Sequence, residues 1–213
     1  MSKSVDKQAK VSALIKLAAV LVLGVGAGVA MFLVTLRATP EGATAANSVS
    51  PAALQGFVDH QGAEFDPAVL HGRFALMYFG FTLCPDACPT ALYNLTLALR
   101  QLDPDARRIQ PVFVSIDPAR DTAEKLNDYL GHFSTQIIGL TAPADVTERV
   151  EQVLGVIAVE HRDERLPGGY TMDHSNEFLL FSPAGKLLVR LPADTGIDAL
   201  VEQLRGLTRA QTV

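Results

Sequence analysis

The chain contains only two cysteines, and both lie in one short motif, Phe79-Gly-Phe-Thr-Leu-Cys84-Pro-Asp-Ala-Cys88-Pro-Thr. The motif follows an apolar run and precedes a predicted helix. The first turn of a helix carries partial positive charge and free N–H groups, which stabilise a thiolate and lower its pKa. The spacing brings both sulfurs to one side of a turn, close enough to form a disulfide or to share a metal ion.

Three kinds of chemistry are open to Cys84 and Cys88. A purely structural disulfide would close a very short loop, so it would remove little entropy from the unfolded chain and stabilise it weakly. A thiol–disulfide oxidoreductase fits the position, although its cysteines are usually separated by one residue fewer. A pair of soft sulfur ligands suits Cu(I), and one imidazole beside the pair would complete a three-coordinate copper site.

Among the five histidines, His174 is the strongest candidate for that imidazole. The others lie in predicted surface turns, at a helix end or in a polar stretch, where a surface or capping role is expected; they are His60, His71, His132 and His161. His174 lies in a predicted loop that begins with Gly168 and Gly169, and these glycines would let the loop move while a metal enters or leaves. Asp173 is expected to orient the ring of His174 or to add negative charge near the ion. On residue chemistry alone, ligation by His174 and a role without a metal remain equally open.

The segments that must position these residues alternate between strands and helices. Continuous apolar runs predict buried strands at 73–80 and 109–116 and a short strand at 137–140. Apolar spacing and capping residues predict helices at 89–102, 122–133 and 143–154, and a last helix is predicted at 196–207. Residues 177–190 are typical of a hairpin that turns at Ser182-Pro-Ala-Gly185. This order is found in α/β proteins with a thioredoxin-like fold.

An apolar segment precedes this domain. From Leu17 to Leu36, twenty consecutive residues carry no charge, and a helix of that length spans roughly 30 Å, the thickness of the hydrocarbon core of a bilayer. A cleaved signal peptide is the alternative, but its apolar region usually has about 7–15 residues. The sequence therefore predicts a single transmembrane helix at 17–36. It follows a cytoplasmic segment at 1–16 and is joined by a linker at 37–54 to a domain at 55–213.

The charges that flank the apolar segment predict its orientation. Four lysines precede it and only Arg37 follows closely, which marks the N-terminal side as cytoplasmic and places the domain in the periplasm, attached to the inner membrane. Residues 1–37 hold five of the 18 basic residues and one of the 23 acidic ones, so the remainder has 13 basic and 22 acidic residues and a formal charge of −9. Such a surface repels phosphate backbones, which argues against nucleic acid as a partner.

Three strings in this order resemble the Sco/SenC family of membrane-anchored copper chaperones for cytochrome c oxidase. They are Tyr78-Phe-Gly-Phe-Thr-Leu-Cys84-Pro-Asp-Ala-Cys88-Pro-Thr, Phe113-Val-Ser-Ile-Asp-Pro-Ala-Arg-Asp-Thr122 and Tyr170-Thr-Met-Asp-His174-Ser. The resemblance extends over about residues 55–207. It implies a thioredoxin-like fold and a mononuclear copper site, for Cu(I) or Cu(II), with Cys84, Cys88 and His174 as ligands.

The resemblance also bears on residues around the ligands. Asp117 matches a position that the family uses near its site, and we assign supporting roles to Asp117, to Asp86 and to Asp173. Leu83 stands where many relatives have a histidine. This departure leaves the ligand set intact and is expected to alter the tuning of the site or its partner surface.

The leading hypothesis is a copper chaperone that serves the CuA centre of cytochrome c oxidase subunit II, the client that the resemblance implies. Other periplasmic copper carriers or thiol reductants are further expected partners. Reduced Cys84 and Cys88 would hold the ion, whereas a redox disulfide between them would abolish copper binding. A thiol–disulfide reductase that keeps client cysteines reduced is the alternative, and it gives His174 no necessary part. A peroxiredoxin-like peroxidase or redox sensor is a third hypothesis, based on the shared fold.

Overall fold

The computed structural model describes residues 51–134 and 136–210. The predicted cytoplasmic segment at 1–16, the predicted transmembrane helix at 17–36 and most of the predicted linker at 37–54 lie outside these residues. Among the helices that the structure describes, none has the length and apolar character needed to cross a membrane.

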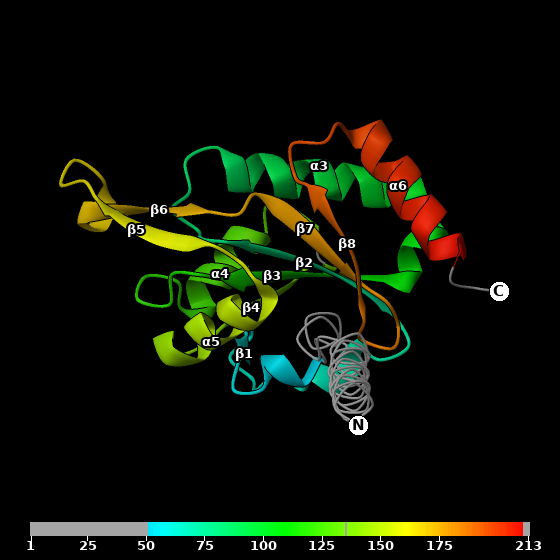
Figure 1. Ribbon diagram of the computed structural model, residues 1–213. Coiled ribbons are helices and arrows are strands. Elements are labelled where there is room, and N and C mark those ends of the chain that lie inside the picture. Colours follow the sequence, from blue (N-terminus) through cyan, green and yellow to red (C-terminus); the bar gives the residue numbers. More distant parts are fainter. Residues whose placement is uncertain (1–50, 135, 211–213) are drawn as a thin grey trace, which may run out of the picture. The chain divides into compact units, whose positions relative to one another are not determined.

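A six-stranded mixed sheet forms the centre of the described domain, with the strand order β1-β4-β3-β2-β7-β8 (Figure 1). The strands are β1 (Val58–Asp59), β2 (Phe74–Gly80), β3 (Ile109–Ser115), β4 (Ile138–Thr141), β7 (Glu177–Phe181) and β8 (Leu187–Pro192). The central strands β2, β3 and β4 are parallel, whereas β7 is antiparallel to β2 and β8 to β7. Every residue of β2 and β3 is buried, as expected for strands covered on both faces.

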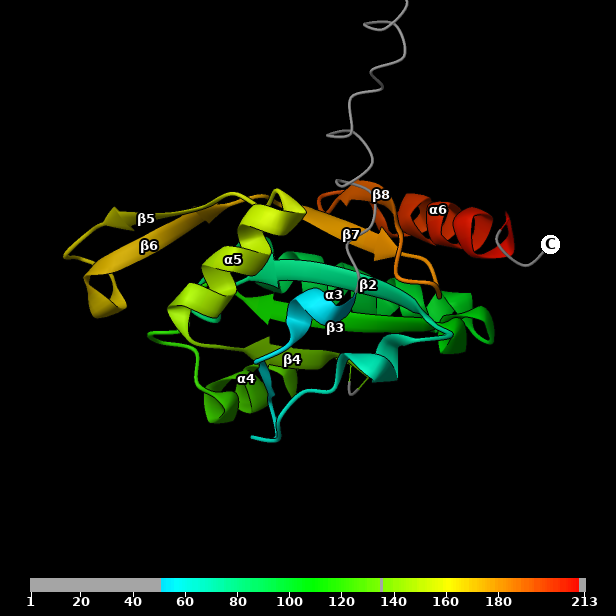
Figure 2. The same ribbon diagram turned by 60° about the horizontal axis from the view of Figure 1, so that its bottom comes forward.

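Four α-helices surround this sheet: α3 (Ala87–Leu102), α4 (Ala123–Leu130), α5 (Ala144–Leu154) and α6 (Ile197–Ala210). Helices α3 and α6 pack side by side on one face, and α5 covers the other (Figure 2). Short 3-10 turns connect the larger elements: η1 (Pro51–Leu54), η2 (Pro67–Leu70), η3 (Asp105–Arg108) and η4 (Pro167–Gly169). The predicted alternation of strands and helices, the final hairpin and the last helix are confirmed.

The starts of two of these helices, α4 and α3, bear on the predicted site. The hydroxyl of Thr122 accepts a hydrogen bond from the backbone N–H of Lys125, which starts α4. This helix ends at Leu130, earlier than the predicted end at residue 133, and Gly131 is its C-cap. Helix α3 starts at Ala87, so Cys88 lies within its first turn. The cysteine motif therefore lies at a helix start, where partial positive charge is expected.

The prediction of a loop before His174 was wrong. Tyr170–His174 forms strand β6, which pairs with β5 (Ala158–Arg162) in a separate two-stranded antiparallel ribbon. Gly168 and Gly169 lie in the turn between these strands with φ values of 83° and 79°, a conformation that favours glycine. Figure 1 shows the β5–β6 ribbon extending beyond the edge of the main sheet.

Candidate metal centre

Cys84, Cys88 and His174 meet beside the C-terminal end of β2, although they come from three separate segments. Cys84 lies in the loop after β2, Cys88 in the first turn of α3, and His174 at the end of β6. Their ligand atoms all lie within 4.8 Å of one another, and Sγ of Cys88 is 3.3 Å from Nε2 of His174. In the part of the chain that the structure describes, no other group of three or more His, Cys, Asp or Glu side chains is placed to hold a metal ion.

The loop that carries Cys84 is held by a buried carboxylate, Asp121. This carboxylate accepts hydrogen bonds from the backbone N–H of Thr82 at 3.1 Å and from its hydroxyl at 2.6 Å. It also accepts one from the hydroxyl of Ser115 at 2.7 Å. Burial raises the pKa of Asp121 above its ordinary value, while the donors from Thr82 and Ser115 favour the charged form. Sequence reasoning missed Asp121, although it lies in the second of the three family-like strings.

The two sulfurs have different environments. Cys84 is partly buried and Cys88 fully buried. The backbone N–H of Cys88 donates to Sγ of Cys84 at 3.3 Å. The Cys88 thiol contributes most to lowering the pKa of Cys84, to about 4, and the backbone N–H groups of Cys88 and Asp86 lower it further, against the effect of burial. The pKa of Cys88 is raised, first because its thiol donates to Cys84 and second because it is buried. Cys84 therefore carries the negative charge and Cys88 keeps the proton.

Cys88 packs tightly against strand β2 at Gly80. A Cβ atom at Gly80 would lie 2.9 Å from Sγ of Cys88 and 3.1 Å from atoms of the Phe113 and Tyr78 rings. Such distances are shorter than van der Waals contact, so only glycine leaves room for the sulfur. This close approach fixes the depth at which Cys88 lies beneath the site.

The imidazole of His174 is held on several sides. Its centroid lies 6.0 Å from the ring centroids of both Tyr78 and Phe81, each in an edge-to-face arrangement. Its Nδ1 atom lies 3.0 Å from the carbonyl oxygen of Ser175. Because a carbonyl only accepts hydrogen bonds, this contact assigns the proton to Nδ1 and leaves the lone pair of Nε2 directed at the sulfurs. The hydroxyl of Tyr78 also donates to Oδ1 of Asn176 at 2.9 Å, which secures the chain after His174.

The structure places Asp173 away from the role expected for it. Its carboxylate lies 2.9 Å from Nε2 of His161 on the neighbouring strand and is exposed. Neighbouring residues of a strand point to opposite faces, so Asp173 and His174 diverge. The ring of His174 is oriented instead by the hydrogen bond that its Nδ1 donates to the carbonyl oxygen of Ser175.

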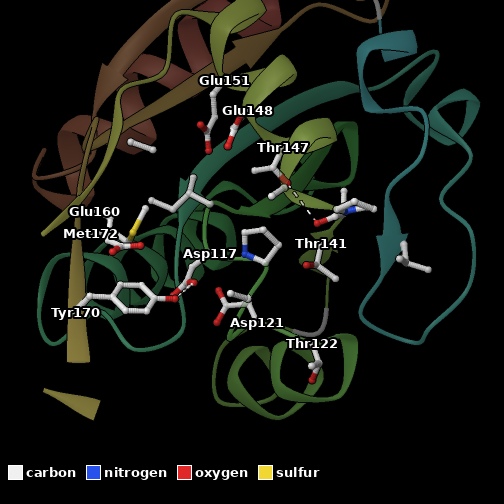
Figure 3. A pocket seen from close by; sticks show the side chains of 18 residues that line it. Asp117, Asp121, Thr122, Thr141, Thr147, Glu148, Glu151, Glu160, Tyr170 and Met172 are labelled. Atoms are coloured by element: carbon white, nitrogen blue, oxygen red, sulfur yellow. Dashed lines mark hydrogen bonds between the residues drawn. The ribbon is translucent and has the colours of Figure 1, made fainter. Parts of the chain in front are cut away.

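The other two supporting aspartates also act at a distance from the sulfurs. Asp117 is buried, and its carboxylate accepts hydrogen bonds from the hydroxyl of Tyr170 at 2.6 Å and from Nε of Arg120 at 2.5 Å. Figure 3 shows the Tyr170 hydroxyl directed at Asp117 on the wall of a neighbouring cavity. Asp86 is the N-cap residue of α3, and its carboxylate accepts a hydrogen bond from the Thr90 hydroxyl at 3.3 Å. Only its backbone N–H acts on Cys84.

The donor set of this cluster fits copper. Two cysteine sulfurs and one imidazole nitrogen are ligands that bind copper well, and the sulfurs favour Cu(I). The carboxylates of Asp117, Asp121 and Asp173 are each engaged by other side chains. The cluster therefore offers two sulfurs and one nitrogen without a hard oxygen ligand.

The mixed α/β domain, with two cysteines at a helix start and a histidine facing them, defines a thioredoxin-like protein with a candidate metal site. The chain belongs to the SCO1/SenC family, because the model of that family matches residues 53–209. It is 36% identical over 179 residues to mitochondrial SCO2 of Saccharomyces cerevisiae, a match that covers 80% of this chain and 60% of the yeast protein. It is 35% identical over 205 residues to an SCO2-like protein of Rickettsia conorii, covering 92% of this chain and 98% of that protein.

Solved structures agree with this assignment. Bradyrhizobium japonicum ScoI with copper bound is 29% identical, with a TM-score of 0.64, and the match covers 70% of this chain and 94% of ScoI. Yeast Sco1 with copper bound is 34% identical, with a TM-score of 0.60, covering 74% of this chain and 92% of Sco1. These matches confirm the expected family and its thioredoxin-like α/β fold. Together with the cluster of Cys84, Cys88 and His174, they confirm copper as the expected metal.

Proposed function

We propose that this protein is a copper chaperone that binds one copper ion through Cys84, Cys88 and His174 and supports assembly of the CuA centre in cytochrome c oxidase subunit II. The observation that carries the proposal is the convergence of the three donor atoms within 4.8 Å from three separate segments. The copper-bound relatives support the metal. Membership of the SCO1/SenC family supports the oxidase as the client.

The three ligand side chains have different roles in taking up the ion. Cys84 is partly exposed and already a thiolate, so it is the first sulfur available to copper. Cys88 must lose its proton before its sulfur can bind. His174 presents Nε2 because its Nδ1 faces the carbonyl of Ser175. Copper is the cargo, and its bonds to two thiolates and an imidazole can be exchanged one by one for bonds to the ligands of a client.

We further propose that the domain works in the periplasm, attached to the inner membrane by residues 17–36. The uncharged run at 17–36 and the lysines before it support this topology. A tether would keep the copper donor beside a client that is itself in the membrane. Protease added to intact spheroplasts tests it: we expect digestion of the domain, and full protection of the domain would contradict the topology.

Copper titration of the reduced full-length protein in detergent tests the metal site. We expect His174→Ala to lower the affinity for Cu(I) and to change the absorption spectrum of the Cu(II) form, because one of three donors is lost. His132→Ala is a matched control, since His132 lies just after the C-cap of α4 and its Nδ1 faces the carbonyl of Tyr129. Unchanged affinity and spectrum in His174→Ala would remove this residue from the site.

A second candidate function, thiol–disulfide reduction, is favoured by the unequal cysteine pair. A partly exposed thiolate beside a buried protonated thiol suits attack and resolution. The Cys84 thiolate would attack a client disulfide to form a mixed disulfide. Cys88 would then lose its proton and attack Sγ of Cys84; the client sulfur leaves as a thiolate and takes up a proton, and a Cys84–Cys88 disulfide remains. We expect His174→Ala to leave turnover of a disulfide peptide unchanged, and absence of any exchange would contradict this function.

A further inference from the structure

The loop at residues 117–121, between β3 and α4, contacts both segments that carry the metal-site residues. On one side, Asp121 binds the backbone and the hydroxyl of Thr82, just before Cys84. On the other side, Asp117 and Arg120 bind Tyr170 at the start of strand β6, which ends at His174. One short loop therefore connects the cysteine segment to the histidine segment.

Arg120 makes most of the contacts on the histidine side. Its Nη1 donates to the carbonyl oxygen of Pro167 at 2.9 Å and to that of Tyr170 at 2.8 Å. Its Nε donates to Asp117 at 2.5 Å, and its side chain is only 11% exposed. The guanidinium carbon lies 3.5 Å from the centroid of the Tyr170 ring. A planar group that is bonded in three directions and stacked on a ring has little freedom to move.

The turn of the ribbon is shaped to receive this side chain. Gly168 has a φ of +83°, and a Cβ atom there would lie 3.1 Å from Cδ of Arg120. The Tyr170 hydroxyl and Nε of Arg120 both donate hydrogen bonds to the carboxylate of Asp117. The three groups therefore form one connected unit at the start of β6.

The β5–β6 ribbon has few other means of fixing its position. Residues 159–162 of β5 are exposed, and no residue of β6 is fully buried. A two-stranded ribbon of this kind is only marginally stable alone. Ala158 and Met172 pack against the core, and Ser175 pairs with Ile157 at the base of the ribbon. The contacts with Arg120 hold the end of the ribbon that extends beyond the main sheet (Figure 1).

Arg120 also reaches the His174 ring by a second route. Its guanidinium carbon lies 5.9 Å from the centroid of the Phe81 ring. Phe81 in turn contacts the imidazole of His174 edge to face, with 6.0 Å between centroids. Loss of Arg120 would therefore loosen both the strand that carries His174 and one of the rings packed against its side chain.

We propose that Arg120 is a positioning residue that sets where His174 lies relative to Cys84 and Cys88. The inference rests on the proposed copper function. When Arg120 is removed, fewer molecules hold Nε2 of His174 facing the sulfurs, so copper binds more weakly and leaves faster. The cysteine loop keeps its own anchor, Asp121, so the redox chemistry of the cysteines alone does not change.

The test compares Arg120→Met with a matched control, Arg73→Met, in the full-length protein in detergent. Arg73 lies just before β2, at the end of that strand away from the site, and donates to Gln110 at 2.5 Å and to the carbonyl of Ile109 at 3.1 Å. Cu(I) affinity is measured by competition with a chelator, together with the spectrum of the Cu(II) form and the reduction potential of the Cys84–Cys88 disulfide. We expect Arg120→Met to lower copper affinity about 10- to 100-fold, as changes around metal ligands do. It should also alter the Cu(II) spectrum and leave the potential unchanged, whereas Arg73→Met changes none of the three.

A double-mutant cycle with His174→Ala shows whether Arg120 acts through the histidine. We expect Arg120→Met to have no further effect on affinity once His174 is absent. An unchanged affinity in Arg120→Met, or an equal loss in the His174→Ala background, would overturn the inference while leaving the copper function intact. Failure of the unmodified protein to bind copper would overturn the proposed function and this inference together. If Arg120→Met does not fold, Arg120→Lys is used, with a smaller loss expected because a lysine cannot reproduce the fork of bonds.

Discussion

Sγ of Cys88 lies 3.3 Å from Nε2 of His174, although 86 residues separate them in the sequence. The contact joins the first turn of α3 to the last residue of β6. The sulfur belongs to a buried thiol and the nitrogen presents a lone pair. The three donor atoms are therefore already close together before a metal binds, and the unequal cysteines give the apo protein its own testable chemistry.

Alkylation of the reduced apo protein by iodoacetamide should depend on pH in an unusual way. The pKa of Cys84 is lowered to about 4, chiefly by the thiol of Cys88. A thiolate is the reactive form, so the rate at Cys84 should be nearly constant above about pH 5 and should fall only as the pH drops below about 4. Cys88→Ala removes the thiol that lowers the pKa of Cys84 most, so the profile should shift to higher pH. A rate that still rises tenfold per unit between pH 6 and 8 would contradict the assignment of charge.

Gly80→Ala should damage the site through packing alone. The new Cβ would lie 2.9 Å from Sγ of Cys88, against a sulfur backed by two aromatic rings. Overpacking of this kind costs about 1–3 kcal/mol, so urea unfolding should show lower stability and copper titration a weaker site. Gly206→Ala is the control, because Gly206 lies in α6 with nothing near its Cβ position. That change should be neutral or stabilising, and equal losses in both variants would argue against the packing explanation.

The stability of the domain should fall as the pH rises from about 4.5 to 7 because of Glu151. Burial, and secondly the neighbouring Glu148, raise the pKa of Glu151 to about 7. Figure 3 shows the two carboxylates close together on the cavity wall. In this pH range the folded protein keeps a proton that the unfolded chain has lost, so deprotonation on rising pH disfavours the folded state.

The size of this effect is on the order of 1–2 kcal/mol, after allowance for the partial solvent screening of Glu151. Unfolding free energies at pH 4.5 and 7.5 measure it. Glu151→Gln should remove most of the decline, and Glu202→Gln, on the exposed face of α6, should not. A decline of the same size in Glu151→Gln would show that other groups cause it.

The parts of the fold that were predictable from the sequence are those that local patterns determine. Strands β2 and β3 are buried on both faces, so their apolar residues form continuous runs. The β5–β6 ribbon gives no such signal, because most of β5 is exposed and polar. Without the strand, the opposite directions of Asp173 and His174 could not be foreseen, and Asp173 was assigned a role that Ser175 fills.

The candidate site likewise contains residues that the sequence predicts and residues that it does not. The chemistry of Cys84 and Cys88 follows from residue type, spacing and a helix start. On residue chemistry alone, ligation by His174 and a role without a metal were equally open, and only the family resemblance identified it as a ligand. Asp121 and Arg120 act through contacts with residues distant in the chain, Thr82 and Tyr170. No local pattern reveals such contacts, so their part in the site comes from the structure.

Copper loading should release about one proton per ion at pH 7.5, not the two expected when two ordinary thiols become ligands. Cys84 is already a thiolate in the apo protein, so only Cys88 loses a proton when both sulfurs bind. Calorimetric titration with Cu(I) in buffers of different ionisation enthalpy measures the number released. In Cys88→Ser we expect release of a proton only from whatever fraction of Cys84 is then protonated. Two protons per ion for the unmodified protein would mean that both thiols are protonated at rest, and would reject the unequal pair.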